Sequence, residues 1–220
     1  ELKKECKTDL ELELAVHDYI VGSSTYDKQA ISVLETPQEN SENPYGILFN
    51  KTGICLGYTT AFQLFMDMAQ IPCITVYSQD EDGDEHAWNQ VEIDGKWYYV
   101  DCTWDDPVPE NDGRAPYHTY FNVTEEFMEE SGHCWNKEDC HKADSYDASF
   151  YLADYYQAED KSELQEIVDQ AVSQGKMDFV IKTQDQMIEL SDYFVSHKKG
   201  VFVGGQIEFD GSWYTLLMRY

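Results

Sequence analysis

The chain has few basic residues and no long hydrophobic run. Lys and Arg number 15 against 43 Asp and Glu, which gives a formal net charge of −28 at pH 7. Phosphate backbones and anionic membrane surfaces repel such a chain, so nucleic-acid binding is not expected. No apolar stretch approaches the ~18 residues of a membrane span, so no membrane insertion is expected. The acids are spread along the chain, which favours solubility in an extracellular setting over an acidic binding tail.

Several site signatures are also missing. The sequence has neither G-x-G-x-x-G nor G-x-x-x-x-G-K-[ST], and its acidic run at 80–85 lacks the ligand spacing of an EF-hand. Six cysteines are widely spaced with no C-x-x-C pair. Cys134 and Cys140, beside His133 and His141, leave a small disulfide loop and a metal site open as alternatives. Because that segment lacks a tight ligand pair, we expect no metal, and we expect no cofactor.

Apolar spacing predicts the elements of the first part of the chain. Asp94-Gly95 is the favoured dipeptide of a two-residue type I′ turn and predicts a hairpin. The residues between the hairpin and 148 are expected to be mostly irregular, apart from a short helix near 124–130. The other predicted elements are a helix from about 10 to 21, a loop over 35–53, a helix over 55–69 closed by Pro72, a strand over 71–77, and hairpin strands over 86–93 and 96–103.

The last 60 residues have a different character. Ser162 with Gln165, and Thr183 with Gln186, fit capping boxes that open two helices. A strand is expected between these helices, and two more strands are expected around Asp210-Gly211. We therefore predict two domains, 1–158 and a small αβαββ domain over 159–220 whose role the sequence does not indicate.

Cys55 is the first candidate for chemistry. It lies in Gly53-Ile54-Cys55-Leu56-Gly57-Tyr58, at the predicted start of a helix. Unpaired N–H groups and the positive end of the helix dipole favour a thiolate there. The flanking glycines would let a substrate approach the backbone closely. The alternative for a cysteine in this position is a small buried apolar residue.

The hairpin brings a second pair of residues together. With Asp94-Gly95 as the turn, opposing residue numbers sum to 189, so Val91 faces Tyr98 and Trp88 faces Asp101. His86 and Asp101 then become diagonal neighbours on one face, within reach of a hydrogen bond. A carboxylate on one imidazole nitrogen leaves the other nitrogen free to take a proton from a thiol. The alternative is an exposed His–Asp pair on a solvated strand face.

Three blocks of sequence together resemble a known family. These are the block around Cys55, then His86-Ala87-Trp88-Asn89, then the run from Trp97 to Trp104. In this order and spacing they resemble the transglutaminase-like superfamily, particularly its bacterial secreted branch. The stretches at 17–19 and 43–46 are also similar to that branch. The resemblance covers roughly residues 10 to 125.

The resemblance implies an α+β fold with a papain-like core, in which a helix bearing the nucleophile packs on an antiparallel sheet. It implies Cys55 as nucleophile, His86 as general base and acid, and Asp101 as the orienting carboxylate. Tyr45 is then a candidate second oxyanion donor, with a surface loop tyrosine as the alternative. Trp88 and Trp104 are expected to wall the cleft.

The function that follows is a secreted or surface-attached thiol enzyme that attacks peptide or isopeptide amides through a thioester. We expect a cysteine peptidase-like hydrolase with a protein or peptide substrate. The alternatives are a protein-crosslinking transglutaminase and a non-catalytic binding or scaffold module that retains the fold. The oligomeric state is not predicted. We also expect Cys102, on the apolar face of the hairpin, to be buried and structural.

Overall fold

The chain forms two compact units, Glu1–Phe150 and Tyr151–Tyr220. The computed structural model describes residues 6–31, 38–78, 85–106, 116–150, 155–173, 178–183, 205–209 and 213–219. Among these residues, no helix is long and apolar enough to cross a membrane. The predicted second helix of the C-terminal part, the acidic run at 80–84 and the turn Asp210-Gly211 lie outside the described residues.

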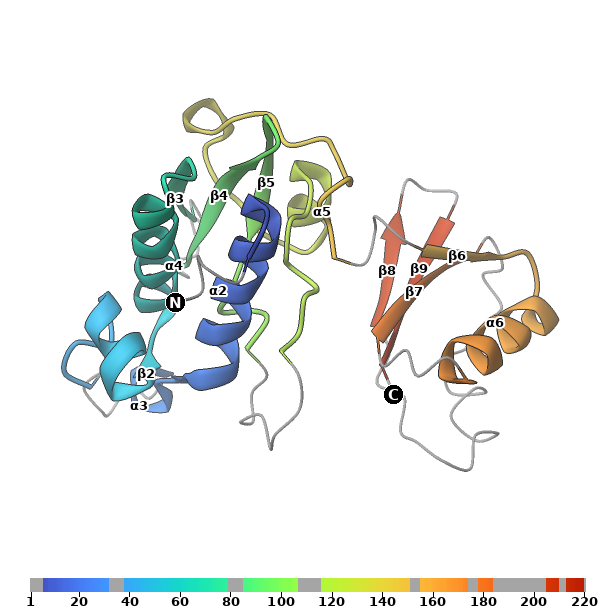
Figure 1. The fold of residues 1–220 in the computed structure, drawn as a ribbon, viewed down its shortest axis with the longest axis horizontal. Coiled ribbons are helices and arrows are strands. Elements are labelled where there is room, and N and C mark those ends of the chain that lie inside the picture. The colour runs from blue at the N-terminus through green and yellow to red at the C-terminus, as the bar shows by residue number, and fades with distance from the viewer. Residues whose placement is uncertain are drawn as a thin grey trace. The chain divides into compact units, whose positions relative to one another are not determined.

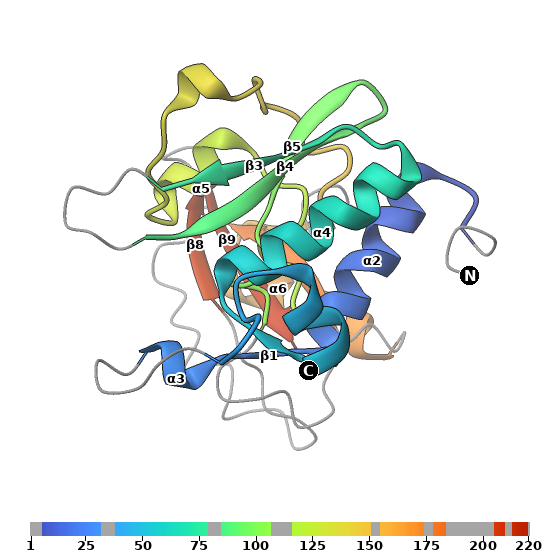
Figure 2. The same cartoon turned by 90° about the vertical axis from the view of Figure 1, so that its left-hand side faces the viewer.

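The first unit is an α+β assembly built on two helices and a sheet (Figure 1). Helix α2 spans Asp9–Ser23 and helix α4 spans Cys55–Ala69. The sheet is antiparallel, in the order β3-β4-β5, with β3 at Cys73–Tyr77, β4 at Ala87–Ile93 and β5 at Lys96–Val100. Helix α4 packs on β3 and β4 and lies beside α2, as Figure 2 shows in a view turned by 90°. The expected nucleophile helix on an antiparallel sheet is therefore confirmed.

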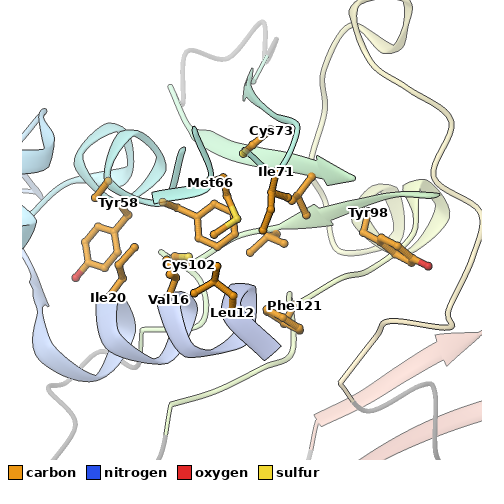
Figure 3. Close-up of a cluster of buried hydrophobic side chains, with 14 of the residues drawn as sticks. Leu12, Val16, Ile20, Tyr58, Met66, Ile71, Cys73, Tyr98, Cys102 and Phe121 are labelled. Atoms are coloured by element: carbon orange, nitrogen blue, oxygen red, sulfur yellow. The ribbon is translucent and has the colours of Figure 1, made fainter. Parts of the chain in front are cut away.

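Apolar residues at helical spacing form the core between these elements. Leu12, Val16 and Ile20 lie along one side of α2 and point toward Met66 and Cys102 (Figure 3). Burial of such side chains stabilises the fold by about 1.5–3 kcal/mol each. Cys102 is 3 % exposed, so its predicted burial is confirmed. This burial raises the pKa of the Cys102 thiol well above its usual range.

The predicted hairpin has the predicted register. Ile93 pairs with Lys96 and Val91 with Tyr98. Asp94 and Gly95 have φ angles of 50° and 77°, as a type I′ turn requires. The turn and the alternation of the strands together fix which side chains share a face.

The second face of the hairpin is covered by the segment after it. Helix α5, Glu125–Glu130, contacts β5, and the Trp135 Nε1–H donates to the Tyr99 hydroxyl at 3.1 Å. Tyr99 is fully buried as a result. The alternative of a solvated strand face is therefore wrong, because aromatic side chains of 118–135 occupy it. The short 3₁₀-helix η2, Lys137–Asp139, follows this segment.

The predicted loop over 35–53 contains regular structure. Residues Gly46–Asn50 form a π-helical turn, η1, and Thr52–Gly53 form a short strand, β2, that pairs in parallel with β1, Thr25–Tyr26. A four-residue helix, α3, spans Lys28–Ile31. The polar composition of 35–53 hid these elements, because main-chain contacts hold them together. The Ser41 carbonyl, for example, accepts the Ile54 N–H at 2.9 Å.

The second unit carries a four-stranded sheet in the order β6-β7-β9-β8. Strands β6, Tyr155–Ala158, and β7, Asp178–Thr183, are parallel and are connected through α6, Lys161–Ser173. Strands β8, Gly205–Phe209, and β9, Trp213–Arg219, complete the sheet in antiparallel fashion. The predicted boundary at 158/159 had assigned β6 to the first domain, but β6 pairs with β7 and belongs to the second unit.

The expected capping box of α6 is also placed differently. The Asp160 carboxylate accepts the N–H groups of Ser162 and Glu163, so Asp160 and not Ser162 is the N-cap. The Glu163 side chain accepts the Glu159 N–H at 2.8 Å. The helix therefore begins earlier in the sequence than the predicted capping box, because the carboxylate of Asp160 is the stronger acceptor for these N–H groups.

Candidate active site

Cys55 is the first residue of α4, and its thiol is partly exposed. The N-cap, Ile54, has no side chain that could accept the free N–H groups of the first turn. The Tyr26 phenol lies beside the main chain of Cys55, because the pairing of β1 with β2 places Tyr26 opposite Gly53. Burial, together with the nearby Cys55, raises the pKa of the Tyr26 phenol, so the phenol keeps its proton.

His86 precedes β4 and contacts both other residues of the predicted triad. Its Nε2 lies 2.6 Å from Oδ2 of Asp101, and its ring lies close enough to the Cys55 side chain for the two groups to interact. A carboxylate only accepts hydrogen bonds, so Nε2 carries the proton and Nδ1 is the nitrogen left for the thiol. Burial lowers the pKa of His86, but the bonds to Asp101 and Cys55 outweigh burial and raise it to about 10.

Asp101 is completely buried and accepts four hydrogen bonds. Oδ1 accepts the N–H groups of Thr103 and Trp104 at 2.9 and 3.1 Å. Oδ2 accepts from His86 and from Nε2 of His133, at 2.6 and 3.1 Å. Burial raises the pKa of the Asp101 carboxyl, but the bonds from His133 and His86 prevail and lower it to about 2. Asp101 is therefore an anion held in one orientation.

The other predicted site residues differ in their placement. Trp104 is 44 % exposed and stacks on the His86 ring at 5.7 Å, at the surface beside the imidazole. Trp88 is only 1 % exposed, so it supports the His86 ring from behind instead of walling an open cleft. Tyr45 is 53 % exposed and stacks on Phe49. Among the described residues no hydrogen bond joins its hydroxyl to the triad, so its oxyanion role stays a prediction.

Two residues of the site were missed by sequence reasoning. Tyr26 lies 29 positions before Cys55 and reaches it only through the β1–β2 pairing. His133 was considered only with Cys134 as part of a metal or disulfide loop. Gly132, two residues past the end of a short predicted helix, was the available signal that His133 follows a helix end. All six cysteines are free thiols in the structure.

The glycines beside Cys55 also serve a different purpose from the one expected. A Cβ on Gly57 would lie 2.3 Å from the Ser41 carbonyl oxygen, and one on Gly53 would lie 2.8 Å from the same atom. The chain's own loop at Ser41, and not a substrate, approaches these positions. The glycines thus allow the loop that precedes η1 to pack against the start of α4.

Within the part of the chain that the structure describes, two clusters have a composition that could hold a metal ion, His17 with Asp18 and His118, and His86 with Asp101 and His133. In each cluster the ligand atoms lie within 4.8 Å of one another. In each cluster the carboxylate accepts hydrogen bonds directly from both imidazoles, so each cluster forms a hydrogen-bonded network.

Residues 1–102, which contain Cys55, His86 and Asp101, match the family described as the transglutaminase-like superfamily. This stretch is a transglutaminase-like domain. The human and mouse proteins called kyphoscoliosis peptidase are 32 % and 31 % identical to the chain over 115 residues. That stretch is 47 % of this chain, and the chain spans 17 % of those relatives' length.

Two solved structures are similar to parts of this chain. A structure described as a TGase has a TM-score of 0.41 and 18 % identity, and the match covers 73 % of this chain and 38 % of that one. A candidate cysteine protease from Cytophaga hutchinsonii has a TM-score of 0.33 and 17 % identity over 48 % of this chain and 34 % of its own. With TM-scores below 0.5, neither match indicates the fold or the function of this chain.

Proposed function

We propose that the transglutaminase-like domain is a thiol hydrolase that cleaves peptide or isopeptide amides through Cys55, His86 and Asp101. The observation that carries this proposal is the 2.6 Å bond between the His86 ring and the Asp101 carboxylate, with the Cys55 side chain beside the same ring. This is the arrangement that activates a thiol by moving its proton to an oriented imidazole. The peptidase names of the human and mouse relatives support hydrolysis as the reaction.

The first half of the reaction forms a thioester. His86 Nδ1 takes the thiol proton, and the Cys55 sulfur attacks the amide carbonyl carbon, whose oxygen becomes an oxyanion. Asp101 stabilises the imidazolium that results. The imidazolium then gives its proton to the leaving amine nitrogen as the C–N bond breaks.

The second half releases the acid. His86 takes a proton from water, the water oxygen attacks the thioester carbon, and the Cys55 sulfur leaves and regains its proton from His86. The products are a carboxylic acid and an amine, with the enzyme restored. If an amine replaced the water, the same steps would transfer the acyl group and crosslink proteins, which is the alternative reaction.

The oxyanion needs two hydrogen-bond donors close to Cys55. The Cys55 N–H is one of them, and the Tyr26 hydroxyl lies beside the same main-chain position. A substrate oxygen that accepts this N–H would also lie within reach of the Tyr26 O–H. We therefore propose Tyr26 as the second donor, in preference to Tyr45, which is 53 % exposed and stacks on Phe49.

One assay on a glutamine-rich protein distinguishes hydrolysis, which releases acid, from transfer of the acyl group to an amine. With dansyl-amine present, we expect free acid and cleaved fragments with little dansyl incorporation, and we expect Cys55→Ala to produce neither. Amine uptake with little acid release would show that the crosslinking alternative is correct.

The alternative from another functional class is a non-catalytic scaffold module that retains the fold. All three triad residues are present, and the His86 ring is hydrogen-bonded to Asp101 and lies beside Cys55, which supports an enzyme. A thiol-reactive probe near neutral pH should label Cys55 much faster than the buried Cys73 and Cys102. Labelling of Cys55 no faster than these two would support the scaffold.

We also propose that the protein acts outside the cell or at its surface. The net charge of −28, spread along the chain, supports a soluble protein in a saline medium. Fractionation of the source cells, with detection in the medium and the surface fraction, tests this placement. Confinement to the soluble interior fraction would contradict it.

A further inference from the structure

A helix C-terminus places His133 against the triad. Helix α5 ends at Glu130 with Ser131 as its C-cap, and Gly132 follows with a φ of +94°. The N–H of Gly132 donates to the Glu129 carbonyl, and the N–H of His133 donates to the Met128 carbonyl, both at 3.0 Å. This is the bonding pattern of a Schellman motif, in which glycine takes the left-handed position. The motif turns the chain so that the residue after the glycine points at β5.

The His133 side chain is buried and contacts Asp101 directly. Its Nε2 lies 3.1 Å from Asp101 Oδ2, the same oxygen that accepts from His86. Because a carboxylate cannot donate when ionised, Nε2 of His133 must carry the proton of this bond. The Ser131 hydroxyl lies 2.9 Å from Nδ1 and fixes the other side of the ring. The His133 ring is therefore held at both of its nitrogen atoms.

Aromatic rings exclude water from this bond. Trp104 lies 4.2 Å from the His133 ring centre to centre, Trp88 lies 4.9 Å away in an edge-to-face arrangement, and Tyr120 lies 5.6 Å away. The Asp101 N–H donates to the Tyr120 carbonyl, so the covering segment also holds the aspartate main chain. A hydrogen bond to an ion in a water-poor site is stronger than one at the surface.

Asp101 without His133 would have one fewer fixed donor. The two N–H groups of Thr103 and Trp104 hold Oδ1 only, so rotation of Oδ2 is restrained by the two imidazoles. His86 is the imidazole that moves a proton during the reaction, whereas His133 has no contact with the Cys55 thiol among the described residues. His133 is thus the static restraint on the oxygen that orients the base.

We propose that His133 is a positioning residue, whose Nε2–H holds the Asp101 carboxylate in the orientation that aligns His86. This inference rests on the function proposed above. It assigns to the Cys–His–Asp site a fourth side chain, supplied by a segment beyond the residues matched by the family. Removal of such a supporting partner costs roughly 10- to 100-fold where it has been measured around metal ligands.

Two substitutions separate hydrogen bonding from packing. His133→Gln retains an N–H donor near the Nε2 position but removes the ring, whereas His133→Phe retains a ring against Trp104 but removes the donor. His141→Gln is the matched control, because His141 is an exposed histidine that stacks on Trp97, away from Asp101. Each variant is compared with the wild-type full chain by its thermal midpoint, by kcat and KM on a peptide amide, and by the rate of Cys55 alkylation at pH 7.

We expect His133→Phe to reduce both kcat and the alkylation rate by roughly 10-fold or more at little change in KM. We expect His133→Gln to stay within about threefold of wild type, and the His141→Gln control to be unchanged. Equal losses in the Gln and Phe variants, a larger loss in Gln, or no loss in Phe would each overturn the proposal. Failure of His86→Ala to slow alkylation would instead contradict the proposed function, so the two failures are distinguishable.

Discussion

Oδ2 of Asp105 lies 3.1 Å from Nε2 of His17, although 88 positions separate the two residues in the chain. Both side chains are fully buried. The Asp105 N–H donates to the Asp101 carbonyl, and its carboxylate accepts the Tyr120 N–H. The pair therefore fastens helix α2 to the turn that follows Asp101, and the stability of the site depends on a helix that contributes no residue to the chemistry.

Substitution of His17 should destabilise the protein in a pH-dependent way. Burial lowers the pKa of His17, but the bonds to Asp105 and Asp18 outweigh the effect of burial and raise this pKa to about 9. A histidine whose pKa is raised on folding contributes its full stability below about pH 6.5 and loses it as the pH rises through the folded value. His17→Gln should therefore lower the free energy of unfolding by about 3 kcal/mol at pH 6 and by less near pH 10.

Urea unfolding of wild type and His17→Gln across this range measures the effect. Glu13 adds a slope of the same sign to both proteins, because burial raises the pKa of its carboxyl to about 8. The difference between the two proteins reports the loss of His17 together with the loss of its Coulombic effect on Glu13, with His141→Gln as the control. A difference that does not change with pH would show that His17 is not charged in the folded protein.

Asp101→Asn should keep the fold and lose most of the activity. The amide oxygen of asparagine still accepts the N–H groups of Thr103 and Trp104, so its NH₂ faces His86. That NH₂ favours the His86 tautomer with its proton on Nδ1, which is the wrong one for accepting the thiol proton. The analogous change in a serine-protease triad lowers kcat by roughly 10⁴-fold.

The pH profile of Cys55 alkylation checks the Asp101→Asn prediction without a substrate. Asp101 and Cys55 overcome burial and raise the pKa of His86 to about 10 in the wild type. In the variant the imidazolium is less stable and favours loss of the thiol proton less, so the rise in alkylation should move to higher pH. Superimposable profiles would mean that Asp101 does not orient His86.

Tyr26→Phe should slow amide cleavage far more than alkylation. Loss of one oxyanion donor typically lowers kcat by roughly 10²- to 10³-fold. Alkylation by a small alkyl halide forms no oxyanion, so the alkylation rate of Tyr26→Phe should change by less than about threefold. Asp101→Asn, in contrast, should slow alkylation near neutral pH. Parallel losses in the two rates would show that Tyr26 acts on the thiol itself. Tyr45→Phe is the matched control, because that hydroxyl is exposed.

Gly57→Ala should destabilise the start of α4. Its Cβ would lie 2.3 Å from the Ser41 carbonyl oxygen, which also accepts the Ile54 N–H directly before Cys55. Overpacking of this kind costs about 1–3 kcal/mol, and the displaced loop should lower Cys55 reactivity as well. Thermal unfolding and alkylation rates measure the two effects.

Gly22→Ala in α2 is the control for Gly57→Ala. Its Cβ would meet Pro116 Cγ at 3.5 Å, an ordinary contact, and alanine is the better helix former by about 1 kcal/mol. The control should be neutral or stabilising. Equal destabilisation of both variants would show that the contact with Ser41 is not the cause.

Local patterns in the sequence were sufficient to predict the elements that carry the triad. The helix over Cys55–Ala69 was predicted with its observed bounds, and Asp94-Gly95 predicted the hairpin and its register. Both signals depend on residues close in the chain, through helical spacing and turn geometry. Once the register is set, the approach of His86 to Asp101 follows, and the structure places their side chains within hydrogen-bond distance. The resemblance of the three blocks to the transglutaminase-like family linked Cys55 to this pair.

Only the tertiary structure decided what surrounds the triad. Tyr26, Asp105 and His133 reach the site through the pairing of β1 with β2, the packing of α2 and the covering segment after β5. The path of such a segment depends on which distant side chains it buries, and no short-range pattern specifies that choice. The sequence by itself therefore determined the three candidate residues of the reaction, and long-range packing determined that Asp101 is buried, held by two histidines and shielded from water.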